Sequence, residues 1–192
     1  MDGPLDLTRL LELARWLDPQ ISADAEHSTR VSRVALALAD AAGFDGRDAA
    51  LAALGGLLHD VGKIAVPMPI LVKPGPLDDH EFGEIMRHPV ASGNLAVRAE
   101  LGDLAILLRH HHERWDGLGY PDRLMGPEIP HIARVLSIAD AYDAMLADRP
   151  YRAALDAVEA RRELERGAGS QFDPELVDVF LRLRVTRLRR AA

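Results

Sequence analysis

The sequence predicts a single all-helical domain, and three observations support this prediction. Apolar residues recur at spacings of three and four in successive segments, which is typical of amphipathic helices. No segment shows the alternating pattern of a strand over a useful length. The chain of 192 residues has the length of one or at most two domains, and it contains neither an internal repeat nor a low-complexity linker.

The first three predicted helices follow one another closely. Residues 5–17 carry leucines on one face, and Asp18-Pro19 is expected to end this helix. A second helix is predicted over 23–42, before Gly43, a residue typical of the position after a helix. The third, over 45–60, is rich in Ala and Leu nearly all round and is therefore expected at the centre of the domain.

The remaining chain alternates loops with helices. Four prolines between residues 67 and 76 predict a structured loop. A second loop, rich in Gly and Pro, is expected between residues 113 and 130. The pattern predicts further helices over 78–86 and 90–99, joined across Pro89, and over 101–112, 132–147, 155–165 and 174–189.

Composition excludes several classes of function. The chain has no cysteine, which excludes disulfides, cysteine nucleophiles and thiolate metal sites and leaves His and carboxylate as metal ligands. The net charge of −7 argues against a general electrostatic grip on DNA or on an anionic membrane. The sequence has neither a long apolar run nor a secretory signal, so a cytoplasmic location is expected.

The pair His59-Asp60 is the first candidate for chemistry. It follows the apolar segment 51–58, where an imidazole and a carboxylate would be costly to bury without compensation. A metal ion is the simplest compensation, since His can bind one cation while the two carboxylate oxygens bridge to a second. The dipeptide is common by chance and needs support from its surroundings.

Further ligand types occur later in the chain. His111 and His112 lie about 100° apart on the predicted helix, close enough to converge on one metal cluster. Asp140 is a carboxylate among apolar neighbours, and Asp143 could instead pair with an arginine such as Arg149. These positions, with His59 and Asp60, predict a metal site built from His and carboxylate.

Lysine is rare in this chain: of the 23 Lys and Arg residues, only those at positions 63 and 73 are lysines. Lys63 follows Asp60 by three residues in the string His-Asp-Val-Gly-Lys. Its compact ammonium could approach a phosphate held against the metals, where it would stabilise charge rather than transfer protons.

Four segments of the chain are distinctive when taken together, namely LLHDVGKIAVP, LVKPGPL, HHERWDGLGYP and IADAYDAMLADRPYR. Together they resemble the HD-GYP subgroup of the HD-domain phosphohydrolases. The resemblance extends from about His27 to Phe180, with the segments in the order and at the separations of that family. The most specific of the four is HHERWDGLGYP, which lies in the second loop.

The resemblance implies a bacterial signalling enzyme, a phosphodiesterase that hydrolyses cyclic di-GMP to pGpG, GMP or both, with a metal-bridging water as nucleophile. It implies that Asp60 bridges the metals, that Lys63 lies near the scissile phosphate, and that Arg149 and Arg152 hold the dinucleotide's phosphates. Three other histidines, His80, His110 and His131, match no ligand position. The implied metal ligands are His27, His59, Asp60, His88, His111, His112 and Asp140.

One departure from the family pattern bears on the metal count. Family members that bind three metals place a Glu one helical turn before the first His, and this chain has Ala23 there. We therefore expect two divalent ions, most simply Fe or Mn, although Asp24 could replace the missing carboxylate.

Partners and boundaries follow from the same resemblance. Gly119, Tyr120 and Pro121 either shape the rim of the site or dock a cyclase of the GGDEF class. The region 23–192 is expected to be the catalytic domain, and 1–22 an N-terminal helix of the same domain or a short extension. A separate sensor protein and a homodimer are further expected partners. The alternatives are a non-catalytic module that binds the dinucleotide or a cyclase, and a hydrolase of another nucleotide.

Overall fold

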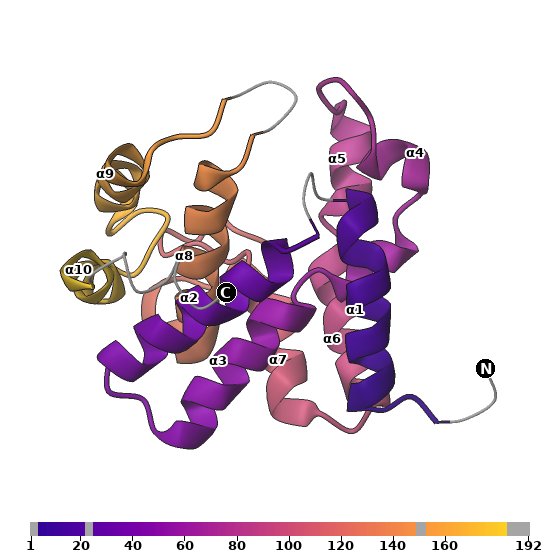
Figure 1. Cartoon of the computed structure of the whole chain (residues 1–192), viewed down its shortest axis with the longest axis horizontal. Helices are drawn as coiled ribbons and strands as arrows, with labels where there is room; N and C mark the ends of the chain where they lie inside the picture. The colour runs from indigo at the N-terminus through magenta and orange to yellow at the C-terminus, as the bar shows by residue number, and fades with distance from the viewer. Residues whose placement is uncertain (1–3, 22–24, 149–152, 184–192) are drawn as a thin grey trace.

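The computed structural model describes residues 4–21, 25–148 and 153–183, and these form the all-helical architecture that the sequence predicts (Figure 1). Within these ranges the only β pairing is an isolated bridge between Ala168 and Phe172. The helices are α1 (Leu7–Ile21), α2 (His27–Ala41), α3 (Gly46–Leu58), η1 (Val61–Ala65), α4 (Met68–Leu71), α5 (Asp79–Ile85), α6 (His88–Arg98), α7 (Gly102–His110), η2 (Gly126–Glu128), α8 (His131–Leu146), α9 (Ala157–Gly167) and α10 (Pro174–Arg182).

Two helical hairpins form the frame of the molecule. Helices α2 and α3 pack along each other and are joined by a short turn at Gly43, whose φ of 82° suits glycine. Helices α6 and α7 form the second hairpin, joined through residues 99–101. The first hairpin is tight because Gly56 leaves no room for a side chain: a Cβ there would lie 2.4 Å from the Ser32 backbone. Each hairpin therefore brings the start of one helix beside the end of the next.

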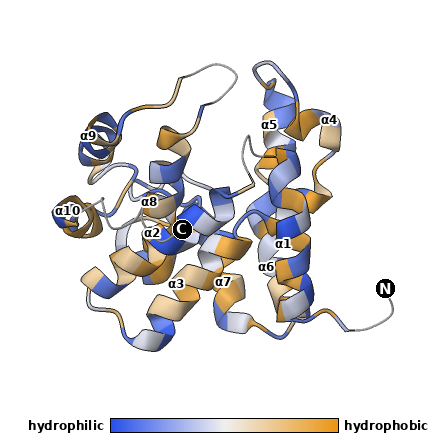
Figure 2. Ribbon diagram, in the orientation of Figure 1, coloured by the Kyte–Doolittle hydropathy of each residue, from blue (hydrophilic) through white to orange (hydrophobic). Residues whose placement is uncertain are grey.

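Helix α8 crosses both hairpins and completes the core. It packs against α2, α3 and α7, and its Tyr142 ring meets Phe180 of α10 edge-on. Helices α9 and α10 cover the other side of α8, while α1 lies against α3, η1 and α6 (Figure 1). Figure 2 shows α3 as mostly apolar, as expected for the central helix, whereas α1 mixes polar and apolar residues along its length.

Three local predictions were wrong. Helix α1 continues through Pro19 to Ile21. The burial of Leu17 and Asp18 stabilises this end of the helix by more than the loss of the backbone hydrogen bond at proline destabilises it. The proline-rich segment contains a one-turn helix, α4, with Pro69 in its first turn, where no backbone donor is needed. Helix α7 ends at His110, so His111 and His112 follow the helix instead of lying on it.

The other helices lie close to their predicted positions. Helix α2 is described from His27, since Ala23 and Asp24 lie outside the described residues. Helix α10 is described to Arg182, although its prediction extended to residue 189. Among the described helices, none is both long enough and apolar enough to cross a membrane.

Candidate metal centre

Four histidines lie at helix ends that the two hairpins bring together. His27 is the first residue of α2 and His59 directly follows α3, so the first hairpin places both at one end. His88 is the first residue of α6 and His111 directly follows α7, so the second hairpin repeats the arrangement. In each hairpin the two Nε2 atoms lie 3.3 Å apart.

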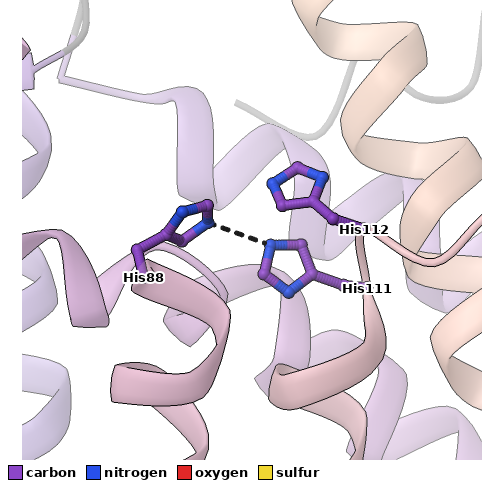
Figure 3. A group of neighbouring side chains, drawn as sticks. All are labelled: His88, His111 and His112. Carbon is purple, nitrogen blue, oxygen red and sulfur yellow. Dashed lines mark hydrogen bonds between the residues drawn. The ribbon is translucent and has the colours of Figure 1, made fainter. Parts of the chain in front are cut away.

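These side chains form two groups in which the ligand atoms lie within 4.8 Å of one another. The first group is His27, His59 and Asp60, and the second is His88, His111 and His112. Figure 3 shows the second group, with the three rings from α6 and from the end of α7 turned toward one another. His59, His88 and His111 are almost completely buried.

Asp60 lies between the two groups. Its Oδ2 atom is 3.4 Å from His59 Nε2, and its Oδ1 atom is 3.4 Å from His88 Nε2. Asp140 of α8 adds a carboxylate to the first group, with its Oδ1 atom 3.5 Å from His27 Nε2 and 3.7 Å from His59 Nε2. The structure thus brings together all seven residues that the sequence analysis expected to bind metal.

The second group has the protonation state that a metal site needs. The Nδ1 atoms of His88 and His111 donate to the carbonyls of Ile85 and Leu108, at 2.7 Å each. Burial lowers the pKa of His88 to about 3 and holds the pKa of His111 well below its ordinary value. At neutral pH both rings are neutral, and their Nε2 lone pairs face each other at 3.3 Å, an unfavourable contact that a cation would relieve.

The first group differs from the second because carboxylates lie beside its histidines. Burial lowers the pKa of His59, but the carboxylates of Asp60 and Asp140 outweigh it and raise the value to about 9. For Asp60, burial alone would raise the pKa, yet the positive charges of Lys63 and His59 hold it well below its ordinary range. The carboxylates of Asp60 and Asp140 are therefore compensated by the Lys63 ammonium and by a proton on His59, and a divalent cation can replace that proton. The donor atoms of both groups fit divalent metals.

Lys63 and Tyr120 border this cluster. The Lys63 ammonium donates to Asp60 Oδ2 at 2.6 Å and is partly exposed. The Tyr120 ring lies 5.0 Å from the His112 ring, centroid to centroid. Burial, together with the carboxylates of Asp140 and Asp60, raises the pKa of the Tyr120 phenol, which is therefore neutral.

The loop that carries Gly119, Tyr120 and Pro121 is fixed by charged contacts. Asp122 accepts two hydrogen bonds from Arg109, at 2.7 Å each, and one from His110 at 2.9 Å. The backbone N–H of Asp122 donates to the buried Glu113 side chain at 2.7 Å. His110 thus holds the loop and lies outside both groups, as do His80 and His131.

Sequence reasoning missed Ser92, which joins the hairpins. Its hydroxyl donates to the His59 carbonyl and accepts from the Gly62 N–H, at 2.8 Å each. Gly62 is required there because a Cβ would lie 2.1 Å from the His88 carbonyl oxygen. The string His-Pro-Val-Ala-Ser-Gly offered no local sign of this role.

The prediction that Asp143 pairs with an arginine is confirmed, and the arginine that the described residues place there is Arg30 on α2. Asp143 accepts two hydrogen bonds from Arg30, at 2.6 and 2.9 Å, and lies 2.7 Å from His27 Nδ1. Sequence spacing could not reveal this, because 113 residues separate the ion pair. Arg149 and Arg152, expected to hold phosphates, lie outside the described residues, as do Ala23 and Asp24.

Comparison with known families and sequences relates most of the chain to known proteins. The family model described as the HD domain matches residues 13–176. The chain is 38% identical over 181 residues to the cyclic di-GMP phosphodiesterase response regulator RpfG of Xanthomonas campestris, covering 92% of this chain and 47% of the relative. It is 41% identical over 161 residues to a cyclic di-GMP phosphodiesterase of Pseudomonas aeruginosa, covering 81% of this chain and 38% of the relative. The chain thus spans less than half the length of these relatives.

A solved structure supports the fold. The cyclic GMP-AMP specific phosphodiesterase V-cGAP3 of Vibrio cholerae superposes with a TM-score of 0.69 at 18% sequence identity. The superposition covers 93% of this chain and 49% of that structure. At this identity the likeness concerns the helical architecture.

Proposed function

The chain belongs to the HD domain family, and we propose that it is a metal-dependent phosphodiesterase that hydrolyses cyclic di-GMP to pGpG, GMP or both. The observation that carries the proposal is the pair of ligand groups with Asp60 between them, one oxygen toward each. The names of two relatives at 38% and 41% identity support cyclic di-GMP as the substrate.

The proposed metal ligands are His27, His59, Asp60, His88, His111, His112 and Asp140, which we infer hold two divalent ions, iron or manganese. Bound there, such ions would supply an acidic water and positive charge at the scissile phosphate. Asp60 would serve both ions, because its two oxygens face different groups.

Other residues of the chain would position and stabilise the phosphate. Lys63 brings a positive charge beside Asp60, where charge develops on the phosphate oxygens during cleavage. Arg149 and Arg152 are proposed to hold the phosphates of the dinucleotide. Tyr120 is neutral and covers His112, so it can pack against the substrate without adding charge.

A water fits better than a side chain as the nucleophile. The chain contains no cysteine. Ser92, a serine beside the cluster, is completely buried and uses its hydroxyl to join the His59 carbonyl and the Gly62 N–H. Its oxygen therefore has neither access to a substrate nor a base to activate it.

The test is hydrolysis of cyclic di-GMP by protein reconstituted anaerobically with Fe(II) or Mn(II), with Asp60→Ala beside it and the products separated by chromatography. We expect metal-dependent turnover that Asp60→Ala abolishes, with 3′3′-cyclic GMP-AMP cleaved more slowly. Binding of cyclic di-GMP without turnover under either metal would refute the enzyme and favour the binding module.

A cyclase of the GGDEF class is the proposed protein partner, and the 118–121 loop its proposed docking surface. Leu118 at the tip is 78% exposed, although Gly119 is buried and Tyr120 partly covered. We expect Leu118→Ser to weaken capture of a GGDEF domain while leaving hydrolysis in place, because the Leu118 side chain is exposed and belongs to neither ligand group. Unchanged capture would assign this loop to the rim of the site alone.

A further inference from the structure

His27 differs from three other clustered histidines in the partner of its second ring nitrogen. The Nδ1 atoms of His59, His88 and His111 each lie 2.7–3.0 Å from a backbone carbonyl three residues earlier in the chain. His27 Nδ1 instead lies 2.7 Å from Asp143 Oδ2 on α8. A neutral carbonyl orients three rings, whereas a carboxylate orients the fourth.

Arg30 completes this contact. It lies one turn after His27 on α2, and its Nε and one terminal nitrogen donate to Asp143 Oδ1 and Oδ2 at 2.6 and 2.9 Å. The two parallel bonds fix the plane of the carboxylate. Asp143 is 3% exposed, so its charge would be costly to bury without this partner.

The contact with Asp143 sets the direction in which the His27 ring points. With Nδ1 bonded to Asp143, the Nε2 atom points into the first ligand group, 3.3 Å from His59 Nε2 and 3.5 Å from Asp140 Oδ1. A carboxylate behind a metal-binding histidine fixes its tautomer and makes it a stronger donor, and removing it typically costs about 10- to 100-fold in metal affinity.

We propose that Arg30 and Asp143 are positioning residues that set the metal affinity of the first ligand group, His27, His59 and Asp60, without affecting the group of His88, His111 and His112. The inference rests on the proposed function in one respect, that these groups bind metal. It adds that a charged pair lies behind one histidine of the first group, whereas His88 and His111 of the second group are oriented by backbone carbonyls.

The test is a titration of metal-free protein with Mn(II), in which the electron paramagnetic resonance signal of free Mn(II) reports binding. For wild type we expect two binding events per chain. In Arg30→Met and Asp143→Asn we expect the Mn(II) affinity of one binding event, assigned to the first ligand group, to fall about 10- to 100-fold. The affinity of the other event should stay unchanged. Arg30→Lys keeps the charge but cannot form both bonds, so it should recover part of the loss.

Arg134→Met is the matched control, because Arg134 also bonds a buried aspartate, Asp173, at 2.8 Å, and neither residue belongs to a ligand group. It should lower stability without moving either binding event. Equal weakening of both events in Arg30→Met, or unchanged binding, would overturn the inference while leaving the metal centre in place. A wild-type chain that binds no Mn(II) would overturn the metal centre as well.

Discussion

At the scale of single residues, the atoms that Nε2 faces separate the histidines that fit a metal centre from His110, which does not. His59, His88 and His111 are buried with their Nε2 atoms facing other ligand atoms. His110 is their neighbour in sequence, yet it bonds the Ile106 carbonyl and Asp122. Two neighbouring histidines therefore have different roles: His110 holds the loop, whereas His111 belongs to a ligand group.

The first prediction uses this difference. His59→Ala and Asp60→Ala should each abolish turnover of cyclic di-GMP, because each removes a ligand atom. His110→Ala should retain most of the activity, since it removes only one of three hydrogen bonds to Asp122. Steady-state hydrolysis at saturating Mn(II) measures both effects. Equal losses in His59→Ala and His110→Ala would mean that the histidine run is assigned one position out of register.

The second prediction at this scale concerns the side chain of Lys63. Lys63→Met removes a positive charge beside Asp60 and should lower kcat about 10²- to 10³-fold, the usual loss on removing one group that stabilises charge in the transition state. Bound metal, measured on the same samples, should stay near the wild-type content. A variant that loses its metal along with activity would show that Lys63 supports the ligands rather than the phosphate.

At the scale of elements, the site depends on how closely η1 packs against α6. Ser92 bonds both His59 and Gly62, and the absence of a side chain at Gly62 allows the His88 carbonyl to approach. This contact holds the end of the first hairpin, with His59 and Asp60, against the start of the second, with His88. A small shift here would separate the two ligand groups.

Gly62→Ala tests that packing. The added Cβ would lie 2.1 Å from the His88 carbonyl oxygen and 2.4 Å from Ser92 N, so the backbones must move apart. We expect a loss of about 1–3 kcal/mol in the free energy of unfolding, measured with urea, and weaker Mn(II) binding. Gly75→Ala is the control, because a Cβ there meets no atom within 4 Å. Similar stability of the two variants would contradict the account of this contact.

The sequence predicted the helices better than the contacts between them. The periodic apolar pattern located every main helix, and His59-Asp60 with His111-His112 predicted a metal site from residue type alone. His27 and His88 entered only through the family resemblance, since nothing beside them in the chain marks a ligand. Asp143 was expected to pair with an arginine such as Arg149, and among the described residues its arginine partner is Arg30 on α2. Pairings across more than a hundred residues depend on the packing of α8 on α2, which local pattern does not encode.

At the scale of the whole molecule, two hairpins of the same layout meet under one crossing helix. Each supplies a histidine at the start of its first helix and another directly after its second. Helix α8 contributes Asp140 to the first group and Asp143 behind His27. The molecule has a net charge of −7, so electrostatic attraction of an anionic dinucleotide requires local positive charge at this junction.

The number of metal ions held per chain tests this arrangement most directly. Protein loaded with excess Fe or Mn, freed of weakly bound metal and analysed by elemental mass spectrometry, should hold close to two ions. His88→Ala, which removes a ligand from the second group alone, should hold close to one. Close to three ions in the wild type, or the same count in His88→Ala as in the wild type, would contradict a centre built from two halves that share Asp60.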